Sequence, residues 1–150
     1  MSEDAQEAVL EALGPEVMRL AARRTTSYEG SVLDQSAFRI LWRLVLDGPK
    51  TLADLGEELQ LERSTISRQV SAAVTRGLVE RTADDDLRVR TVRPTAAGLA
   101  AYRNDIALRA AVWGEAVAQL GADRARALAE ELRAFNDALD RAHGHDAPER

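Results

Sequence analysis

Residues 51–95 constrain the fold more than any other stretch of this chain, because two short helical patterns are followed there by a hairpin pattern. Thr51 and Asp54 are spaced as a capping box, in which a hydroxyl and a carboxylate each bind a backbone N–H group of the first helical turn. Three leucines then recur on one helical face: Leu52, Leu55 and Leu59. The sequence therefore predicts a short amphipathic helix that begins at Thr51.

The second helical pattern separates apolar and polar residues onto opposite faces. At about 100° per residue, the apolar side chains share one side of the helix: Ile66, Val70, Ala73 and Val74. The opposite side carries hydroxyls and one guanidinium: Ser64, Arg68, Ser71 and Thr75. Hydroxyls donate to phosphates, Arg can bind guanine bidentately, and a Gln such as Gln69 on the flank can pair with adenine. This face suits a DNA groove.

A two-stranded hairpin is expected next. Leu78 and Val79 enter the first strand, residues 83–87 form a turn, and the chain returns over residues 88–92. Asp-rich turns between strands rich in Val and Thr are typical of such hairpins.

With these residues, the chain resembles the MarR-type winged helix-turn-helix regulators. The resemblance is carried by STISRQV in the second helix, RGLVER before the hairpin, the D-x-R of Asp86 and Arg88, and the T-x-x-G of Thr95 and Gly98. It extends over nearly the whole chain, since long helices on both sides of the winged element are also typical of the family. It implies a mainly α fold with a small β-hairpin wing, in which a winged helix-turn-helix DNA-binding element is flanked by long dimerisation helices.

Some residues depart from the usual pattern of that family. Gly56 stands where Ala is more common, which should loosen the first helix by about 0.5–1 kcal/mol. Glu62 stands where Ser, Thr or Asp would cap the second helix better. The wing differs at Asp84, Asp85, Arg90 and Pro94. The DNA contacts of the helix are therefore expected to be more secure than those of the wing.

Composition is that of one compact unit, or of one subunit of an intertwined dimer, with 150 residues of which 45% are hydrophobic. We find no run of 18 apolar residues and no basic, apolar N-terminus, so we expect a cytoplasmic protein without a membrane span or secretory signal. The absence of Cys excludes disulfides, thiolate zinc sites and a cysteine-based oxidation switch.

Charge is distributed unevenly along the chain. The net charge is −5, yet residues 61–93 carry seven Arg against five acidic residues, a local charge of +2. Positive charge on the proposed reading element favours nucleic-acid binding that is strongly sensitive to salt.

Helices are also expected before the winged element. Residues 1–4 are expected to be frayed. A helix is predicted after them and through about Tyr28, because apolar residues recur there at intervals of four: Val9, Leu13 and Val17. Its Gly14-Pro15 pair leaves open whether this is one bent helix or two. Asp34 is expected to cap the next helix, which should stop at residues 47–49. Phe38 and Trp42 on that helix are expected in the core, with a ligand pocket as the alternative.

The longest periodic pattern follows the hairpin. A first apolar stripe contains Leu99, Tyr102, Ile106, Ala110, Trp113, Val117 and Leu120. After Gly121, a second stripe contains Leu128, Leu132, Phe135 and Leu139. The winged segment is too small to cover these stripes, so a second copy of the chain is expected to pack on them. We expect residues 1–33 and 95–142 to form the dimerisation region, residues 34–94 the DNA-binding region, and residues 143–150 a disordered tail.

These expectations together describe a sequence-specific transcription regulator, a ligand-responsive repressor that binds a pseudo-palindromic operator in double-stranded DNA as a homodimer. Residues expected in the major groove are Ser64, Thr65, Ser67, Arg68 and Gln69, and those expected near phosphates are Arg63, Ser71 and Arg76. Arg88 would reach the adjacent minor groove, oriented by Asp86. The alternative is a winged-helix protein-interaction module without specific DNA binding.

An effector is implied by the resemblance, since such relatives commonly bind small aromatic or phenolic ligands between the dimer helices and the winged domain. Five aromatic residues could line such a site, and each could equally serve the core or an interface: Tyr28, Phe38, Trp42, Tyr102 and Trp113.

No catalytic constellation is evident, so we expect neither an enzyme nor a cofactor. His143 and His145 are interpreted as an accidental solvated pair in the tail rather than a metal site. Residues 84–86 are interpreted as turn aspartates, because they lack the spacing of a calcium loop.

Overall fold

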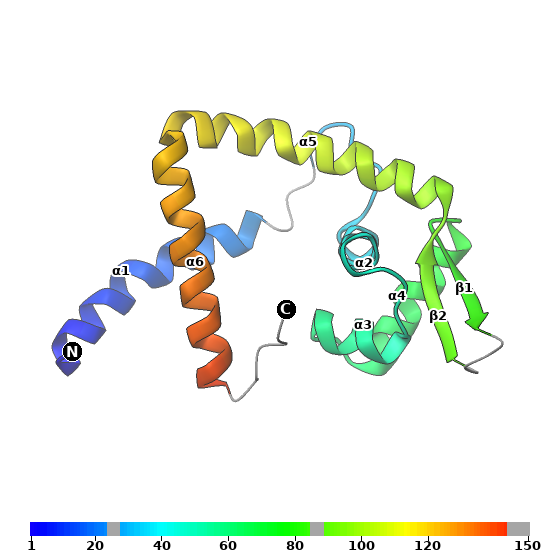
Figure 1. The fold of residues 1–150 in the computed structure, drawn as a ribbon, viewed down its shortest axis with the longest axis horizontal. Coiled ribbons are helices and arrows are strands. Elements are labelled where there is room, and N and C mark those ends of the chain that lie inside the picture. The colour runs from blue at the N-terminus through cyan, green and yellow to red at the C-terminus, as the bar shows by residue number, and fades with distance from the viewer. Residues whose placement is uncertain (24–27, 85–88, 144–150) are drawn as a thin grey trace. The chain divides into compact units, whose positions relative to one another are not determined.

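The computed structural model describes residues 1–23, 28–84 and 89–143, and in this part of the chain it consists of six helices and one two-stranded sheet (Figure 1). The elements are α1 Glu3–Ala22, α2 Gln35–Asp47, α3 Leu52–Leu59, α4 Arg63–Thr75, β1 Val79–Asp84, β2 Val89–Pro94, α5 Ala96–Leu120 and α6 Ala122–Ala142. The mainly α fold with a β-hairpin wing is confirmed. The chain divides into two compact units, Met1–Leu108 and Arg109–Arg150. No described helix has the length and apolar character needed to span a membrane.

The hydrophobic core lies where α2, α3, α4 and the hairpin meet. Its fully buried side chains come from all of these elements: Ile40, Leu41, Leu55, Ile66, Val70, Val79 and Val92. Leu52 and Val74 pack at its margin, so the predicted apolar faces of α3 and α4 are confirmed. Each such side chain contributes about 1.5–3 kcal/mol when fully buried.

Local hydrogen bonds explain where α3 begins. The Thr51 hydroxyl accepts from the Asp54 N–H at 3.1 Å, which confirms the hydroxyl half of the predicted capping box. Within α3, Gly56 is buried, and a Cβ added there would lie 3.2 Å from both Ile66 Cγ2 and the Leu61 carbonyl oxygen. Gly56 is thus expected to loosen helix α3, but its lack of a side chain allows α3 to pack closely on α4.

The hairpin is longer than the sequence predicted. β1 continues through Asp84 instead of turning at Ala83, and β2 runs to Pro94. The Thr82 and Thr91 hydroxyls lie opposite each other at 2.9 Å, a cross-strand pair that stabilises the ladder. Lys50 pairs with Val92 through two backbone hydrogen bonds of 2.8 and 3.1 Å, a bridge that the sequence did not indicate. The expected turn at residues 85–88 lies outside the described residues.

The T-x-x-G segment has a clear structural role at the start of α5. The Thr95 hydroxyl accepts from the Gly98 N–H at 3.0 Å and donates to the Gly77 carbonyl oxygen at 2.5 Å. A Cβ added at Gly98 would lie only 1.8 Å from the Leu78 carbonyl oxygen. Because only Gly fits this approach, α5 can start directly against the strand entrance.

Helix α2 has the expected ends and one unexpected face. The Asp34 carboxylate caps it by accepting from the Ala37 N–H at 2.9 Å, and Gly48 follows its end with φ 83°. Phe38 packs on the core with its ring centroid 5.6 Å from that of Tyr102. Trp42 is 40% exposed, so its expected place in the core is wrong for this chain. It lies off the buried stripe, which consists of Ala37, Ile40, Leu41 and Leu44.

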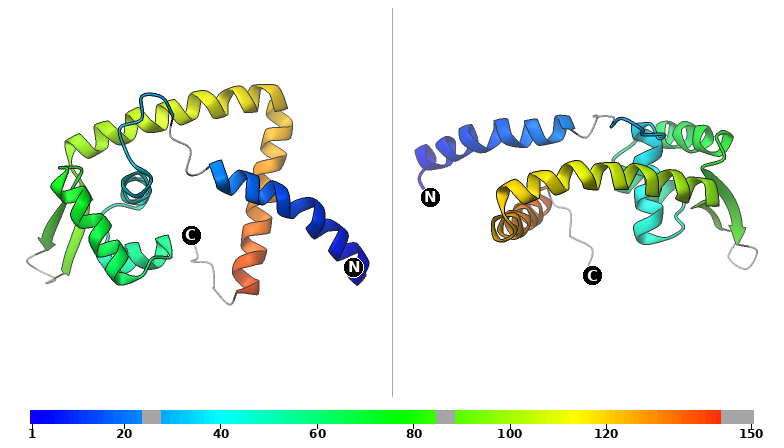
Figure 2. Two further views of the ribbon diagram at one scale, coloured as in Figure 1. Left: turned by 180° about the vertical axis from the view of Figure 1, so that it is seen from behind. Right: turned by 90° about the horizontal axis from the view of Figure 1, so that it is seen from above.

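Helix α1 is one helix rather than two, and it runs through Pro15 (Figure 2). It begins at Glu3, earlier than expected, because the Ser2 hydroxyl accepts from the Ala5 N–H at 3.4 Å. It ends at Ala22, before Tyr28, and residues 24–27 lie outside the described residues.

Helices α5 and α6 are separated by the single residue Gly121 at φ 90°, as the sequence predicted. No residue of α1 or α6 is buried in the described chain. Large apolar side chains are exposed on these helices and on α5: Val9, Leu10, Val17, Met18, Leu20, Ile106, Val112, Trp113, Val117, Leu128 and Leu139. His143 ends α6, and the rest of the expected tail, including His145, lies outside the described residues.

Candidate nucleic-acid interface

The polar face of α4 is exposed over its length. Its apolar side is buried through Ile66, Val70 and Ala73. The four residues predicted to lie opposite that side are all exposed: Ser64, Arg68, Ser71 and Thr75. The core therefore orients α4 so that hydroxyls and a guanidinium point away from the protein.

The other predicted residues of α4 flank this face. Arg63 is exposed, whereas Thr65, Ser67 and Gln69 are half-buried. Glu62 precedes the helix without any side-chain capping hydrogen bond, as its residue type predicted. The Glu62 carboxylate therefore accepts no hydrogen bond from the first backbone N–H groups of α4.

Arg81 belongs to this surface, although the sequence reasoning counted only its charge. It extends from β1, and its guanidinium Nη2 donates to the Ser71 hydroxyl at 2.9 Å. This contact joins the wing to the polar face of α4. Its position in the RGLVER segment, two residues beyond the buried Val79, was the available signal, because residues i and i+2 of a strand point to the same side.

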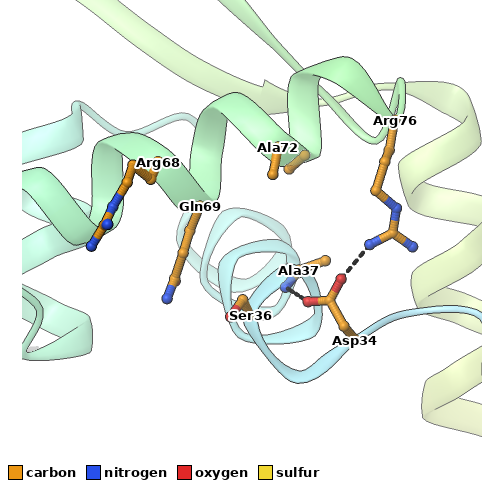
Figure 3. Close-up of a pocket in the computed structure, with 8 residues that line it drawn as sticks. Asp34, Ser36, Ala37, Arg68, Gln69, Ala72 and Arg76 are labelled. Atoms are coloured by element: carbon orange, nitrogen blue, oxygen red, sulfur yellow. Dashed lines mark hydrogen bonds and ion pairs between the residues drawn. The ribbon is translucent and has the colours of Figure 1, made fainter.

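A small pocket of about 260 Å³ lies beside this face, between α4 and the start of α2 (Figure 3). Its polar lining includes Ser36 from α2 and Arg68 and Gln69 from α4. Figure 3 shows Arg68 and Gln69 extending from the same stretch of α4, with Ser36 facing them from α2. The polar surface of α4 therefore continues onto the beginning of α2.

Arg76 is engaged within the protein. Its guanidinium forms an ion pair with Asp34, drawn in Figure 3, and donates to the Val32 carbonyl oxygen at 3.1 Å. Its side chain is 40% exposed. The phosphate contact expected for Arg76 stays a prediction, and this guanidinium already has two protein partners.

The wing tip lies outside the described residues, and with it Asp86 and Arg88. Nearer the body of the wing, Arg93 Nε donates to Glu80 at 2.7 Å, so part of the positive charge is paired. Arg63 and Arg68 form no ion pair with any described residue. These two guanidinium groups of α4 therefore have no carboxylate partner among the described residues.

Ion pairs away from the α4 face connect α3 to α2 and to the segment between them. Lys50 Nζ lies 2.6 Å from Glu58 Oε1, and Arg43 Nη2 lies 2.9 Å from Glu58 Oε2. The hydrogen bond to Glu58 raises the pKa of Lys50, while burial acts in the opposite direction. Burial raises the pKa of Tyr102. These groups support the scaffold on which α4 is mounted.

A helix packed across a second helix, with its outer face polar and a β-hairpin immediately after it, defines a winged helix-turn-helix protein. Residues 33–88 match the family model described as MarR family. This match confirms the resemblance of the winged segment to the MarR family that its motifs indicated.

Solved structures share the fold over nearly the whole chain. A MarR family protein from Bacillus stearothermophilus has a TM-score of 0.79 at 19% identity, covering 93% of this chain and 98% of its own. A mutant MarR from E. coli, complexed with operator DNA, has a TM-score of 0.68 at 20% identity, covering 90% and 99%. The PcaV transcriptional regulator from Streptomyces coelicolor, in complex with its natural ligand, has a TM-score of 0.61 at 24% identity, covering 93% and 97%. No curated protein matches the sequence.

Proposed function

We propose that this protein is a transcriptional repressor that binds a pseudo-palindromic DNA operator through α4 as a homodimer. The observation that carries this proposal is the exposed polar face of α4 opposite Ile66 and Val70. A helix mounted in this way can enter the major groove, where donors and acceptors of all four base pairs are distinguishable. The E. coli MarR whose fold it shares was solved with operator DNA.

Each predicted residue has a role in this proposal. Base edges are read by Ser64, Thr65, Ser67, Arg68 and Gln69, and phosphates are bound by Arg63 and Ser71. We add Arg81 to the phosphate-binding residues because its guanidinium contacts Ser71. Arg76 was also expected near phosphate, but its two protein partners favour a role in holding the end of α4. Arg88 of the wing reaches the minor groove and is oriented by Asp86.

Homodimer formation is supported by the apolar side chains that the chain leaves exposed. Trp113 is 53% exposed, Val117 47% and Leu128 51%, all on the heptad-like stripes. Exposed stripes of this kind are unfavourable in water by about 25 cal/mol per Å², and a second copy would cover them. Two-fold pairing would also present two α4 helices to half-sites one duplex turn apart.

A small aromatic or phenolic effector would release the DNA. PcaV, which shares the fold, was solved with its natural ligand. Trp42 offers an exposed aromatic surface on α2, so it is the first residue to examine for contact with an effector.

The test begins with genomic footprinting, which supplies an operator, followed by duplex titrations across a range of salt concentrations. Arg68→Ala should weaken operator binding by about 1–3 kcal/mol and relax base preference at one position per half-site. Arg103→Ala is the matched control, since Arg103 is exposed on α5 and is not among the residues proposed to contact DNA. Unchanged operator affinity in a folded Arg68→Ala protein would reject its base contact.

The same titrations distinguish specific DNA binding from the alternative function, a protein-interaction module. Specific DNA binding predicts an affinity that falls steeply as salt rises, because phosphate contacts release counterions. Binding without sequence preference or salt dependence would favour the interaction module instead.

A further inference from the structure

Asp105 on α5 is the one buried charged residue in the described part of the chain, with 3% exposure. A buried carboxylate is unfavourable by several kcal/mol unless its oxygens are well hydrogen-bonded. The hydrogen-bond partners of Asp105 are therefore contacts on which the fold depends.

Both carboxylate oxygens of Asp105 bind the loop before α2. Oδ1 accepts from the Val32 N–H at 2.9 Å, and Oδ2 accepts from the Leu33 N–H at 3.0 Å. The neighbouring Asn104 amide donates to Asp105 Oδ1 at 2.9 Å and to the Gly30 carbonyl oxygen at 3.0 Å. Hydrogen bonds to a charged acceptor are about twice as strong as neutral ones. Two adjacent residues of α5 thus fix the backbone of residues 30–33.

Arg76, the first residue after α4, holds the same loop from the other side. Arg76 donates to the Val32 carbonyl oxygen. It also pairs with Asp34, and Asp34 in turn caps α2 (Figure 3). Val32 therefore gives its N–H to α5 and its carbonyl oxygen to Arg76. The path from Asp105 to the end of α4 contains only three loop residues, Val32, Leu33 and Asp34.

We propose that Asp105 is a positioning residue for operator recognition, which acts through the Val32–Asp34 loop and Arg76 to set the orientation of α4. This inference rests on the proposed DNA-binding function. The buried side of α4 sets which face points outward, and its C-terminal end is also anchored through Arg76, so the exact placement of the reading face depends in addition on where the loop lies. Base contacts depend strictly on geometry, whereas non-specific binding depends mainly on charge. Loss of Asp105 should therefore weaken base-specific binding more than non-specific binding.

Arg76 has a distinct expected signature in this arrangement. A residue that contacts phosphate reduces the salt slope of binding by about one unit when it is removed. A residue that positions α4 lowers operator affinity and leaves the slope unchanged. Arg76→Gln distinguishes the two roles, and its partly exposed side chain makes the variant readily tolerated by the fold.

The experiment uses the full-length protein, its footprinted operator and an unrelated duplex of equal length. Asp105→Asn keeps the shape of the side chain but turns one acceptor oxygen into a donor that faces a backbone N–H. We expect the ratio of operator affinity to unrelated-duplex affinity to fall about tenfold, equivalent to about 1.4 kcal/mol, with the salt slope unchanged. Asp123→Asn is the matched control, because that carboxylate is 97% exposed on α6 and should leave the ratio unaltered.

Two further measurements keep the inference falsifiable. Arg76→Gln should lower the same ratio, and the double variant with Asp105→Asn should lose no more than the larger single effect, because both act through one loop. Amide hydrogen exchange without DNA should be faster at Val32, Leu33 and the last turn of α4 in Asp105→Asn. An unchanged ratio in a folded Asp105→Asn protein, additive losses, or a reduced salt slope in Arg76→Gln would overturn the inference. A wild type without operator preference would instead overturn the proposed function, while the exchange result would still report on the loop contact.

Discussion

Helices α4 and α6 carry comparably regular apolar stripes, but only α4 buries its stripe within the chain. Ile66, Val70 and Ala73 of α4 are buried, whereas no residue of α6 is buried in the described structure. Leu128 and Leu139 of α6 remain 51% and 39% exposed. Periodicity therefore shows which face of a helix is apolar, but it does not show what covers that face. For α4 the cover is the chain itself, and for α6 we propose a second copy.

The largest effect is expected from placing a charge in the stripe of α6. Leu132→Glu should prevent dimer formation and abolish operator binding, although it leaves α4 untouched, because a carboxylate cannot be buried unpaired in an apolar interface. Sedimentation and DNA titration of the same samples test this. Ala134→Glu, at an exposed position off the stripe, is the control and should remain dimeric. A well-folded wild-type monomer at low micromolar concentration would refute the proposed dimer.

A second prediction compares two glycines of α5. Gly98→Ala would place Cβ 1.8 Å from the Leu78 carbonyl oxygen, so the start of α5 must shift, at a cost of about 3 kcal/mol or more. Gly114 has nothing within 4 Å of an added Cβ, so Gly114→Ala should not destabilise the isolated chain. Chemical denaturation measures both. A concentration-dependent loss of stability in Gly114→Ala alone would indicate a partner helix packed at that position.

The wing should contribute less to operator binding than α4 does. Arg88→Ala is expected to reduce affinity and to lower the salt slope by about one unit, because one contact to DNA is lost. Asp86→Ala should do less, since it removes only the partner that orients the guanidinium. Titrations at several salt concentrations compare the two variants. A larger loss in Asp86→Ala than in Arg88→Ala would contradict the roles assigned to this D-x-R segment.

The smallest effect concerns the scaffold at alkaline pH. The pKa of Lys50 is raised in the folded protein, mainly by its hydrogen bond to Glu58, so the stabilisation is fully present below the unfolded-state pKa of about 10.5. It is lost as the pH rises through the higher folded-state value. Lys50→Met should therefore flatten the fall of unfolding free energy above about pH 10. Denaturation at pH 8 to 11 measures this, and an equal fall in both proteins would show that the pair does not contribute.

Much of the winged segment could be predicted from the sequence, because its signals are local. The Thr51 and Asp34 caps, the buried face of α4 and the helix break at Gly121 all depend on residues a few positions apart. The loop contacts of Asp105 join residues more than 70 positions apart, and no periodicity indicates them. Trp42 was misplaced for a related reason, since its apolar character did not reveal that α2 presents a neighbouring stripe to the core.

The bridge between Lys50 and Val92 also bears on how copies of the protein avoid uncontrolled association. Backbone groups of Lys50 occupy the side of β2 that faces away from β1, so an additional strand cannot pair with Val92 there. The other border of the described sheet is β1, where the charged Glu80 and Arg81 stand. Charged side chains on an edge strand discourage pairing with strands of other molecules. The edges of the described sheet thus disfavour pairing with strands of other molecules, which agrees with the proposed association through helical surfaces.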